Sequence, residues 1–406
     1  MRSVTIEERT SGRRLGLWLT PWVLLVVVGV WAAYLCLRYG LNQTNMDNRY
    51  AFGLWIFLDL TIIALGAAAF TSGFLLYVLG REELRPLVPS AVVVGFACYS
   101  GAVGILAIDV GQPLRAWFTF WHPNVHSMLT EVTFCITCYL IVLALEYTPL
   151  LLDRTGRGGR SFTARFGLEL HDRIGILAGV GALLSFFHQG SLGGLYGVLR
   201  GRPFAFREGW AIWPSTFFLF VLSAVAVGPV FLLAITRVVE RLHGKPLVPP
   251  ETGRFVSRLS GWLLVLYVLA KAVDSLVWIN HTTPAMGVHA YHFYTRPPFG
   301  TWVLMLEIVG LGLVPALLLL WPRTRVHAGW QVVAALLASA GIALNRFVMT
   351  VQTLALPTLP FDELWTYVPS WQEVASFTAV VGYAVVLYTL SFRYLPLFPR
   401  ARGQGH

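Results

Sequence analysis

Charged residues are scarce in this chain. Asp, Glu, Lys and Arg make up 12% of its 406 residues, whereas hydrophobic residues make up 56% and the mean hydropathy is +0.66. Soluble domains carry about 25% charged residues, so this composition excludes an ordinary soluble protein. The apolar majority must face lipid or other apolar segments, as in a protein that crosses the bilayer several times.

Cysteine is scarce too, and its positions argue against metal chemistry. The chain has four cysteines, Cys36, Cys98, Cys135 and Cys138, all within long apolar runs. Cys135 and Cys138 have the CxxC spacing, but no second pair accompanies them, so we interpret them as packing residues and expect no metal site. No CxxCH motif is present, which argues against covalently bound c-type haem.

Apolar runs long enough to cross a hydrocarbon core of about 30 Å recur along the whole chain. The first run is too long for a cleaved signal peptide and lacks a small-residue cleavage site, so we expect it to remain as an anchor. Little sequence is left between the runs for a soluble domain. The pattern predicts an all-α polytopic membrane protein of about ten transmembrane helices, at residues 16–37, 54–79, 88–110, 125–147, 172–190, 213–237, 257–280, 300–321, 327–349 and 373–395.

The positive charges predict the orientation of these helices, because Lys and Arg gather in cytoplasmic loops. With the N-terminus placed in the cytoplasm, 21 of the 30 Lys and Arg residues lie on the inner side, eight lie on the outer side, and Lys271 lies within a span. Both termini are therefore predicted to be cytoplasmic. This topology accounts for most of the net charge of +10, so nucleic acid is not an expected partner.

A weak internal repeat divides the chain into two similar units. The segment DVGQPLRAWFTFWHP precedes Glu131 after the third run, and TRPPFGTW precedes Glu307 after the seventh. Such repeats are common in membrane proteins. We therefore expect a cytoplasmic segment at 1–15, a flanking helix and outer loop at 16–50, four-helix bundles at 51–200 and 201–350, and an outer loop, a flanking tenth helix and a cytoplasmic tail at 351–406.

The predicted outer loops are long and rich in aromatic residues, glycine and proline. They include LYGVLRGRPFAFREGWAIW and HTTPAMGVHAYHFYTRPPFG. Ordered loops of this kind suit the docking of another protein. A belt of Trp and Tyr at the membrane interface accounts for the same composition, so both interpretations stay open.

Titratable residues gather near the predicted outer ends of four successive spans. One such residue alone is usually a satisfied structural group, but four at one depth favour a substrate, ion or proton site. Arg115 follows the third span as a candidate counter-charge, and Tyr99 and Trp117 add a hydroxyl and a flat ring. The four titratable residues are Asp59, Asp109, Glu131 and His188.

A second polar set lies at the opposite ends of the same helices and consists of Glu146, His171 and Asp172. These residues suit the interface between membrane and water. Together with Ser185 and Glu131 they also suit a proton relay from the cytoplasm to the outer cluster. Such a relay requires intervening water, so both interpretations stay open.

The second unit has polar residues of its own. Lys271 and Asp274 lie at positions i and i+3 of one span, where they are well able to pair. Glu307 and Arg346 lie in the outward halves of the next two spans. We interpret the four residues as a buried ion-pair network, with a second ion path as the alternative.

The chemistry of the outer cluster restricts its ligand. Haem b needs two imidazoles that face each other at one depth, and His188 has no such partner within the spans, so haem is not expected. A quinone headgroup needs hydrogen-bond partners for two carbonyl oxygens and groups that exchange two protons, which the cluster supplies. A transporter is the competing class, although its helices are more often broken by Gly and Pro at mid-membrane.

Three segments of the chain resemble one known family. They are NQTNMDNRYAFGLWIFLDLTIIALGAAAFTSGFLLY, DVGQPLRAWFTFWHPNVHSMLTEVTF and SFFHQGSLGGLYGVLRGRPFAFREGWAIWPSTFF. They look like the NrfD or polysulfide-reductase family of quinone-interacting integral membrane subunits, in the ten-helix branch that includes HybB, DsrP and QrcD. The resemblance covers nearly the whole chain, and the NQTNMDNR loop and the loop after His188 are most similar to those of QrcD.

The resemblance implies a haem-free subunit of two four-helix bundles plus flanking helices. It implies a quinone pocket at the periplasmic ends of the first bundle, and the residues that match this pocket are Asp109, Arg115, Glu131, His188 and Tyr99. The polar residues of the second bundle vary within the family.

The resemblance also implies partners, a membrane and a direction of electron flow. It places the chain in a bacterial inner membrane, beside a periplasmic iron-sulfur subunit, with multihaem cytochrome c and molybdopterin-family-like subunits in the same complex. It favours menaquinone reduction and is compatible with coupled proton uptake from the cytoplasm. The alternatives are a quinol-oxidising subunit of a related complex, an ion or solute transporter that uses the same carboxylates, and a pure membrane anchor.

Overall fold

The computed structural model describes residues 12–153, 173–210, 213–288, 300–355 and 366–398. Within these residues, ten helical stretches are long and apolar enough to cross a membrane. Each corresponds to one of the ten predicted runs, which confirms the prediction of an all-α polytopic membrane protein. The stretches are Gly12–Tyr39, Leu54–Tyr77, Val88–Asp109, Met128–Leu152, Ile174–Gly197, Ser215–His243, Pro250–Ala285, Val303–Leu320, Ala328–Ala355 and Trp371–Tyr394.

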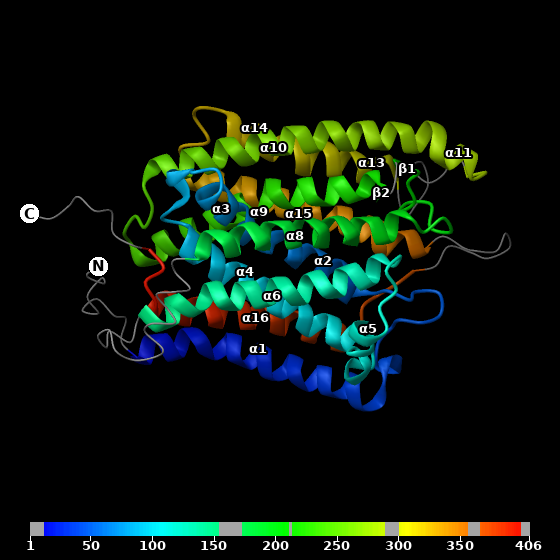
Figure 1. Ribbon diagram of the computed structural model, residues 1–406, viewed down its shortest axis with the longest axis horizontal. Helices are drawn as coiled ribbons and strands as arrows, with labels where there is room; N and C mark the ends of the chain where they lie inside the picture. The colour runs from blue at the N-terminus through cyan, green and yellow to red at the C-terminus, as the bar shows by residue number, and fades with distance from the viewer. Residues whose placement is uncertain (1–11, 154–172, 211–212, 289–299, 356–365, 399–406) are drawn as a thin grey trace, which may run out of the picture.

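The helices lie side by side along the long axis of the molecule (Figure 1). The α-helices are α1 (Gly12–Tyr39), α2 (Leu54–Gly66), α3 (Ala68–Tyr77), α4 (Val88–Asp109), α5 (Phe118–Trp121), α6 (Met128–Asp153), α8 (Ile174–Gly197), α9 (Ser215–His243), α10 (Pro250–Val277), α11 (Thr283–Ala285), α13 (Gly300–Met305), α14 (Val314–Leu320), α15 (Ala328–Thr350) and α16 (Trp371–Tyr394). Two short strands, β1 (Gly209–Trp210) and β2 (Trp213–Pro214), pair antiparallel.

We call the end of the molecule where α1 begins the terminal end and the opposite end the loop end. Helix α16 also ends at the terminal end, whereas α5 and the β-hairpin lie at the loop end (Figure 1). The sequence predicts that the terminal end faces the cytoplasm.

The helices pack in two groups with a flanking pair. Helices α2, α3, α4, α6 and α8 form the first group, and α9, α10, α14 and α15 form the second. The groups meet where α9 packs against α8 and α3, and where α15 packs against α2. Helices α1 and α16 pack together, and α16 joins this pair to α4.

Glycine allows the flanking pair to pack closely. A Cβ atom at Gly29 of α1 would lie only 2.4 Å from the carbonyl oxygen of Ala375 and 2.2 Å from the Cβ of Ala379 on α16. Gly382 of α16 approaches the backbone of Trp22 in a similar way. Small residues that let helix backbones approach are typical of helix contacts in membranes, where apolar burial supplies little driving force.

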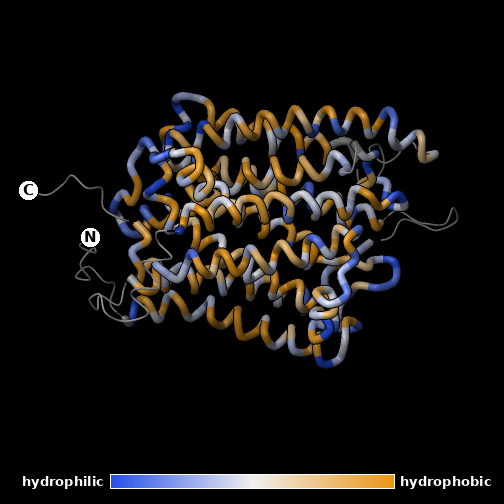
Figure 2. Tube along the Cα trace, viewed as in Figure 1, coloured by the Kyte–Doolittle hydropathy of each residue, from blue (hydrophilic) through white to orange (hydrophobic). Residues whose placement is uncertain are grey.

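The surface of the helical part is apolar in the middle and polar at the two ends (Figure 2). On α1, Leu24, Val27 and Trp31 are exposed, and on α10 so are Leu266 and Val273. An apolar band of this kind suits lipid, because the helices satisfy their backbone groups internally.

Helix α8 continues beyond the predicted end of its span. The sequence predicts an end near residue 190 and a glycine-rich loop after it, but α8 runs on to Gly197. Here the glycines serve helix packing: a Cβ at Gly193 would lie 2.3 Å from the carbonyl oxygen of Thr216, and one at Gly190 would lie 2.2 Å from the ring of Phe217. His188 therefore lies nine residues before the helix end, which corresponds to about 13 Å along the axis.

Two wide π-helical turns interrupt the spans of the second group. One covers Trp278–Thr282 and continues α10, and the other covers Leu306–Leu313 between α13 and α14. The sequence did not predict them. Turns of this type are often found at functional sites.

Candidate functional site

A buried polar cluster occupies the interior of the first helix group. We call it the histidine cluster, and it consists of Tyr99, Tyr139, Ser185, His188 and Gln189, each at most 1% exposed. The Tyr99 hydroxyl lies 2.8 Å from the Ser185 hydroxyl. The Tyr99 ring lies 5.8 Å from the His188 ring and 4.6 Å from the Tyr139 ring. Three helices thus place hydroxyl, imidazole and amide groups together, away from solvent.

The helix period explains how these side chains meet. Ser185, His188 and Gln189 are related by three or four positions and share one face of α8. That face meets Tyr99 of α4, whose ring is packed so closely against α2 that a Cβ at Gly66 would lie 3.0 Å from it. The Gln189 amide donates hydrogen bonds to the carbonyl oxygen of Ile63 at 3.0 Å and to the Tyr99 hydroxyl at 3.4 Å.

Some polar atoms of the histidine cluster have no hydrogen-bond partner among the described residues. These atoms are both ring nitrogens of His188 and the side-chain oxygen of Gln189. The backbone of Val132 lies near the imidazole, but outside hydrogen-bond geometry. Buried polar groups are nearly always satisfied by protein, water or ligand. The cluster therefore suits a ligand with hydrogen-bonding oxygen atoms.

An acidic group lies nearer the loop end of the same bundle. Asp59 is buried on α2, close enough to the partly buried Asp109 of α4 for the two carboxylates to repel each other. Asp109 in turn interacts electrostatically with Glu373 of α16. Glu373 accepts hydrogen bonds from the backbone nitrogens of Asn45 at 3.2 Å and Ser370 at 2.9 Å. Glu373 was not expected from the sequence, because it lies at the N-terminus of a helix, where glutamate is common.

Tyr367 joins this acidic group to the start of α2. Its hydroxyl donates a hydrogen bond to Glu373 and accepts one from the backbone nitrogen of Leu54 at 2.7 Å. Burial and the hydrogen bond to Glu373 raise the pKa of the Tyr367 phenol above its usual range. The phenol is therefore a neutral donor at any physiological pH.

The structure brings together only some of the residues that the sequence groups at one depth. Asp59 lies near Asp109, whereas His188 lies beside Tyr99. Glu131 is partly buried at the start of α6, and its side chain forms no hydrogen bond or ion pair with any described residue. The extension of α8 explains the separation, because it places His188 deeper than its position in the sequence suggests.

Arg115 and Trp117 lie outside the bundle. Both are exposed in the segment between α4 and α5, where Trp117 stacks on Phe118 with ring centroids 4.2 Å apart. Among the described residues, no carboxylate lies within ion-pair distance of Arg115. The expected counter-charge for the buried carboxylates is therefore not formed in this structure.

The predicted relay residues are only partly within the described part of the chain. His171 and Asp172 lie outside the described residues. Glu146 is buried on α6, seven residues and thus two turns from Tyr139, and it interacts electrostatically with Tyr139 and with Tyr77 of α3. Ser185 belongs to the histidine cluster through its contact with Tyr99.

The second helix group holds buried ion pairs, but with other partners than the sequence suggested. Lys271 pairs with Glu307 at 3.4 Å, and Asp274 accepts two hydrogen bonds from Arg207 at 2.9 and 3.0 Å. No ion pair between Lys271 and Asp274 is formed. Arg207, which the sequence placed in an outer loop, is 7% exposed and buried with the bundle. It follows a helix end and a turn, a position that resembles any surface loop in sequence alone.

Arg346 extends this network toward the middle of the molecule. Its guanidinium donates to the Asn345 side chain at 2.7 Å and to the Ser223 hydroxyl at 2.9 Å, and it lies 3.5 Å above the ring of Phe220. Asn345 in turn donates to Glu307 at 2.8 Å. Three helices are thereby connected through buried polar contacts.

These features define an integral membrane protein of many spans with buried polar sites in both helix groups. Among the described residues, no three His, Cys, Asp or Glu side chains gather in a way that could hold a metal ion. The family model of Polysulphide reductase, NrfD matches residues 42–357, which is most of the chain. The chain belongs to the NrfD family.

Several known proteins are similar to the chain over nearly their whole length. The menaquinone reductase integral membrane subunit of Nitratidesulfovibrio vulgaris is 45% identical over 97% of this chain and 94% of its own length. A probable Ni/Fe-hydrogenase 2 b-type cytochrome subunit of Escherichia coli is 25% identical over 91% of this chain and 89% of its own. A putative dimethyl sulfoxide reductase membrane subunit of Halobacterium salinarum is 25% identical over 98% and 94%.

Proposed function

We propose that the chain is the quinone-reactive membrane subunit of a respiratory oxidoreductase complex and that its substrate is menaquinone. The observation that carries this proposal is His188, which is fully buried beside Tyr99 and Gln189 with neither ring nitrogen hydrogen-bonded to a described residue. The similarity of the chain to a protein named as a menaquinone reductase subunit, over nearly the full length of both chains, supports the choice of substrate.

The chemistry of quinone reduction matches the groups in the first bundle. Menaquinone takes up two electrons and two protons to become menaquinol, and its two carbonyl oxygens accept hydrogen bonds throughout. His188 and the Tyr99 hydroxyl are donors for one carbonyl oxygen. Asp59, Asp109 and Glu131 line the way to the loop end and exchange protons with the headgroup. The isoprenoid tail lies between apolar helix faces.

An exposed aromatic surface at the loop end is the proposed docking site for the electron-transfer partner. We define this surface as Leu114, Trp117, Phe118, Trp121 and Val125, and three of these residues, Leu114, Trp121 and Val125, are 88%, 73% and 84% exposed. Contiguous apolar groups above the membrane interface are typical of protein contacts. Arg115 lies within the surface and is available to a partner or to the quinone.

We propose that the partner is a periplasmic iron-sulfur subunit and that electrons flow from it to menaquinone. Multihaem cytochrome c and molybdopterin-family-like subunits complete the complex in this proposal, and the loop end faces the periplasm of a bacterial inner membrane. The reverse flow, from menaquinol to the partner, would use the same residues.

The protons are proposed to come from the terminal end. Glu146 is buried between Tyr77 and Tyr139 in electrostatic terms, and Tyr139 packs on Tyr99, which contacts Ser185. This series spans the distance between the terminal end and His188. Proton uptake by this route would carry charge across most of the membrane and make turnover electrogenic.

Analysis of the purified protein tests the proposal. Purification in mild detergent, extraction and chromatography should find menaquinone in a ratio approaching one per chain, together with an iron-sulfur subunit. The His188→Ala variant should retain the partner but lose most of the quinone. A solitary chain that carries no quinone and shows substrate-dependent flux in vesicles would contradict the proposal and favour a transporter.

A further inference from the structure

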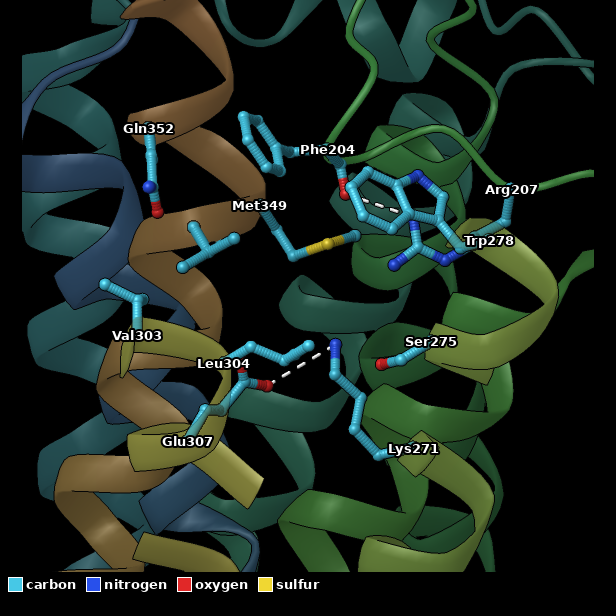
Figure 3. A pocket seen from close by; sticks show the side chains of 11 residues that line it. Phe204, Arg207, Lys271, Ser275, Trp278, Val303, Leu304, Glu307, Met349 and Gln352 are labelled. Atoms are coloured by element: carbon cyan, nitrogen blue, oxygen red, sulfur yellow. Dashed lines mark hydrogen bonds and ion pairs between the residues drawn. The ribbon is translucent and has the colours of Figure 1, made fainter. Parts of the chain in front are cut away.

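A small cavity lies inside the second helix group, apart from the histidine cluster (Figure 3). Its volume is about 20 Å³, enough for one or two water-sized spheres. Figure 3 shows the amino group of Lys271 and the guanidinium of Arg207 directed into it, beneath the rings of Phe204 and Trp278. Glu307, Ser275 and Gln352 also line it.

The buried charges around this cavity do not balance. Three cations, Arg207, Lys271 and Arg346, are each at most 7% exposed. Only two buried carboxylates face them among the described residues, because Asp274 pairs with Arg207 and Glu307 pairs with Lys271. The described hydrogen-bond partners of Arg346 are neutral. One positive charge is therefore in surplus within the described part of this group.

A surplus charge inside a membrane protein must be neutralised, because an uncompensated buried ion is strongly destabilising. Two solutions are available. A bound anion supplies the missing negative charge, or Lys271 loses its proton. The hydrogen-bond donors around the cavity favour the anion.

Several donors face the cavity with capacity to spare. Lys271 has three N–H bonds, and its one described partner is Glu307 at 3.4 Å. Arg207 uses Nε for Asp274 and Nη1 for the carbonyl oxygens of Phe204 and Phe206. None of the described hydrogen bonds uses its Nη2. The Ser275 hydroxyl, on the same helix as Lys271, also lines the cavity.

The cavity has a route to the loop end. A second, wider cavity of about 370 Å³ opens between the β-hairpin and α11, and Arg207 lines both cavities. The wider cavity is also lined by Arg200, which is exposed. An anion that arrives from the loop end would thus meet positive charge along its way.

The two π-helical turns help to form the site. The turn at Trp278–Thr282 carries Trp278 into the cavity wall, and the turn at Leu306–Leu313 carries Glu307. A wide turn costs helix hydrogen-bond geometry, and two of them at one cavity indicate a functional constraint.

We propose that this cavity binds one small monovalent inorganic anion of the size of chloride. Lys271, Arg207 and Ser275 hold the anion, and its charge neutralises the surplus. A chloride ion is only slightly larger than water and fits the volume, whereas larger organic anions do not. The proposal does not depend on the quinone function of the first bundle.

Thermal unfolding of the purified complex tests the site. Chloride is titrated against gluconate at constant ionic strength, so that general salt effects cancel. The unfolding midpoint of the wild type should rise by about 1–2 °C for each tenfold increase in chloride above its dissociation constant. Bromide should act like chloride, and gluconate should have no effect. A midpoint that is independent of chloride would overturn the proposal and point to a neutral Lys271.

Two substitutions should change the chloride response in opposite directions. Lys271→Met removes the surplus charge and should abolish the response. Glu307→Gln raises the surplus from one to two and should lower the half-saturating chloride concentration at least tenfold. Glu82→Gln serves as the matched control, because Glu82 is an exposed residue paired with Arg85, and it should leave the response unchanged. Equal responses in the wild type and Lys271→Met would overturn the proposal.

A spectroscopic measurement covers the case in which a variant does not fold. Iodide quenches indole fluorescence on contact, so it should quench Trp278 with a saturable component that chloride competes away. Trp278→Phe should lose that component and keep the rest of the quenching. Iodide quenching that shows no saturable component in the wild type would contradict the proposal.

Discussion

The histidine cluster unites three kinds of polar group in a fully buried place. His188 and Gln189 have unsatisfied atoms, while Tyr99 and Ser185 satisfy each other. A structural network would be expected to satisfy all of its members, because a partly satisfied buried network is costly. At the scale of single residues, this incomplete satisfaction distinguishes a ligand site from a packing contact.

Replacement of Tyr99 by phenylalanine tests the role of its hydroxyl. The variant leaves the Ser185 hydroxyl without its partner and weakens the contact of Gln189, so we expect the free energy of unfolding to fall by about 1–2 kcal/mol. We also expect the KM for menaquinone to rise, because the hydroxyl is a proposed donor to the quinone. Steady-state kinetics and denaturation of the complex measure the two effects.

Tyr383→Phe is the matched control for this prediction. The Tyr383 hydroxyl lies 2.8 Å from the Ser100 hydroxyl, in a similar contact between α16 and α4 outside the histidine cluster. It should lower stability by a similar amount and leave the KM unchanged. An equal rise of KM in both variants would assign the effect to packing rather than to the quinone site.

At this scale, depth along the spans predicted which residues are buried but not which ones meet. Asp59, His188 and Glu146 are buried as expected of intramembrane titratable groups. The pairs Lys271 with Glu307 and Arg207 with Asp274 depend on how different helices face each other. Neighbours on one helix were the only pairs visible in the sequence, so pairing between helices could not be predicted from it.

At the scale of elements, the flanking pair of α1 and α16 depends on close backbone contact. Gly29 and Gly382 allow each helix to approach the other where a side chain would collide. In lipid, such packing replaces apolar burial as the main stabilising contribution between helices. The pair in turn holds the start of α16, where Glu373 and Tyr367 anchor the acidic group.

Gly29→Val tests this contact. Its side chain would collide with Ala375 and Ala379, so we expect α1 to separate from α16 and the free energy of unfolding to fall by about 1–3 kcal/mol. Gly16→Val on the same helix is the control, because no atom lies within 4 Å of a Cβ at that position. Unfolding in detergent should distinguish the two variants, and equal stability would show that α1 is held by other contacts.

Helix positions were predictable because each span is a long apolar run, whereas their ends were less so. The glycines after His188 resemble a loop in the sequence, but in the structure they are packing surfaces for Phe217 and Phe220 on the next helix. The π-helical turns have no comparable signal, because they arise from tertiary contacts around the cavity of the second group.

At the scale of the whole molecule, the two helix groups hold different kinds of polar site. The first group contains the histidine cluster and Glu146, and the second contains an ion-pair network around a small cavity. The proposed proton route runs within the first group alone. The orientation predicted from Lys and Arg places the start of that route in the cytoplasm.

Glu146→Gln tests the route in proteoliposomes that contain the complex and menaquinone. The substitution removes the proton-exchanging group nearest the terminal end, so the membrane potential formed per electron should fall sharply and the rate should fall about tenfold. Glu82→Gln, an exposed glutamate at the same end, should leave both unchanged. A full potential in Glu146→Gln would assign proton uptake to another route.

The most direct test of the quinone proposal is the rate of menaquinone reduction by the purified complex with His188→Ala. We predict a loss of roughly 100-fold in turnover, because a proton-exchanging group at the headgroup is removed. His327→Ala, an exposed histidine at the terminal end, serves as the control and should retain the full rate. A rate in His188→Ala equal to that of the wild type, with all partner subunits still bound, would contradict the proposed site.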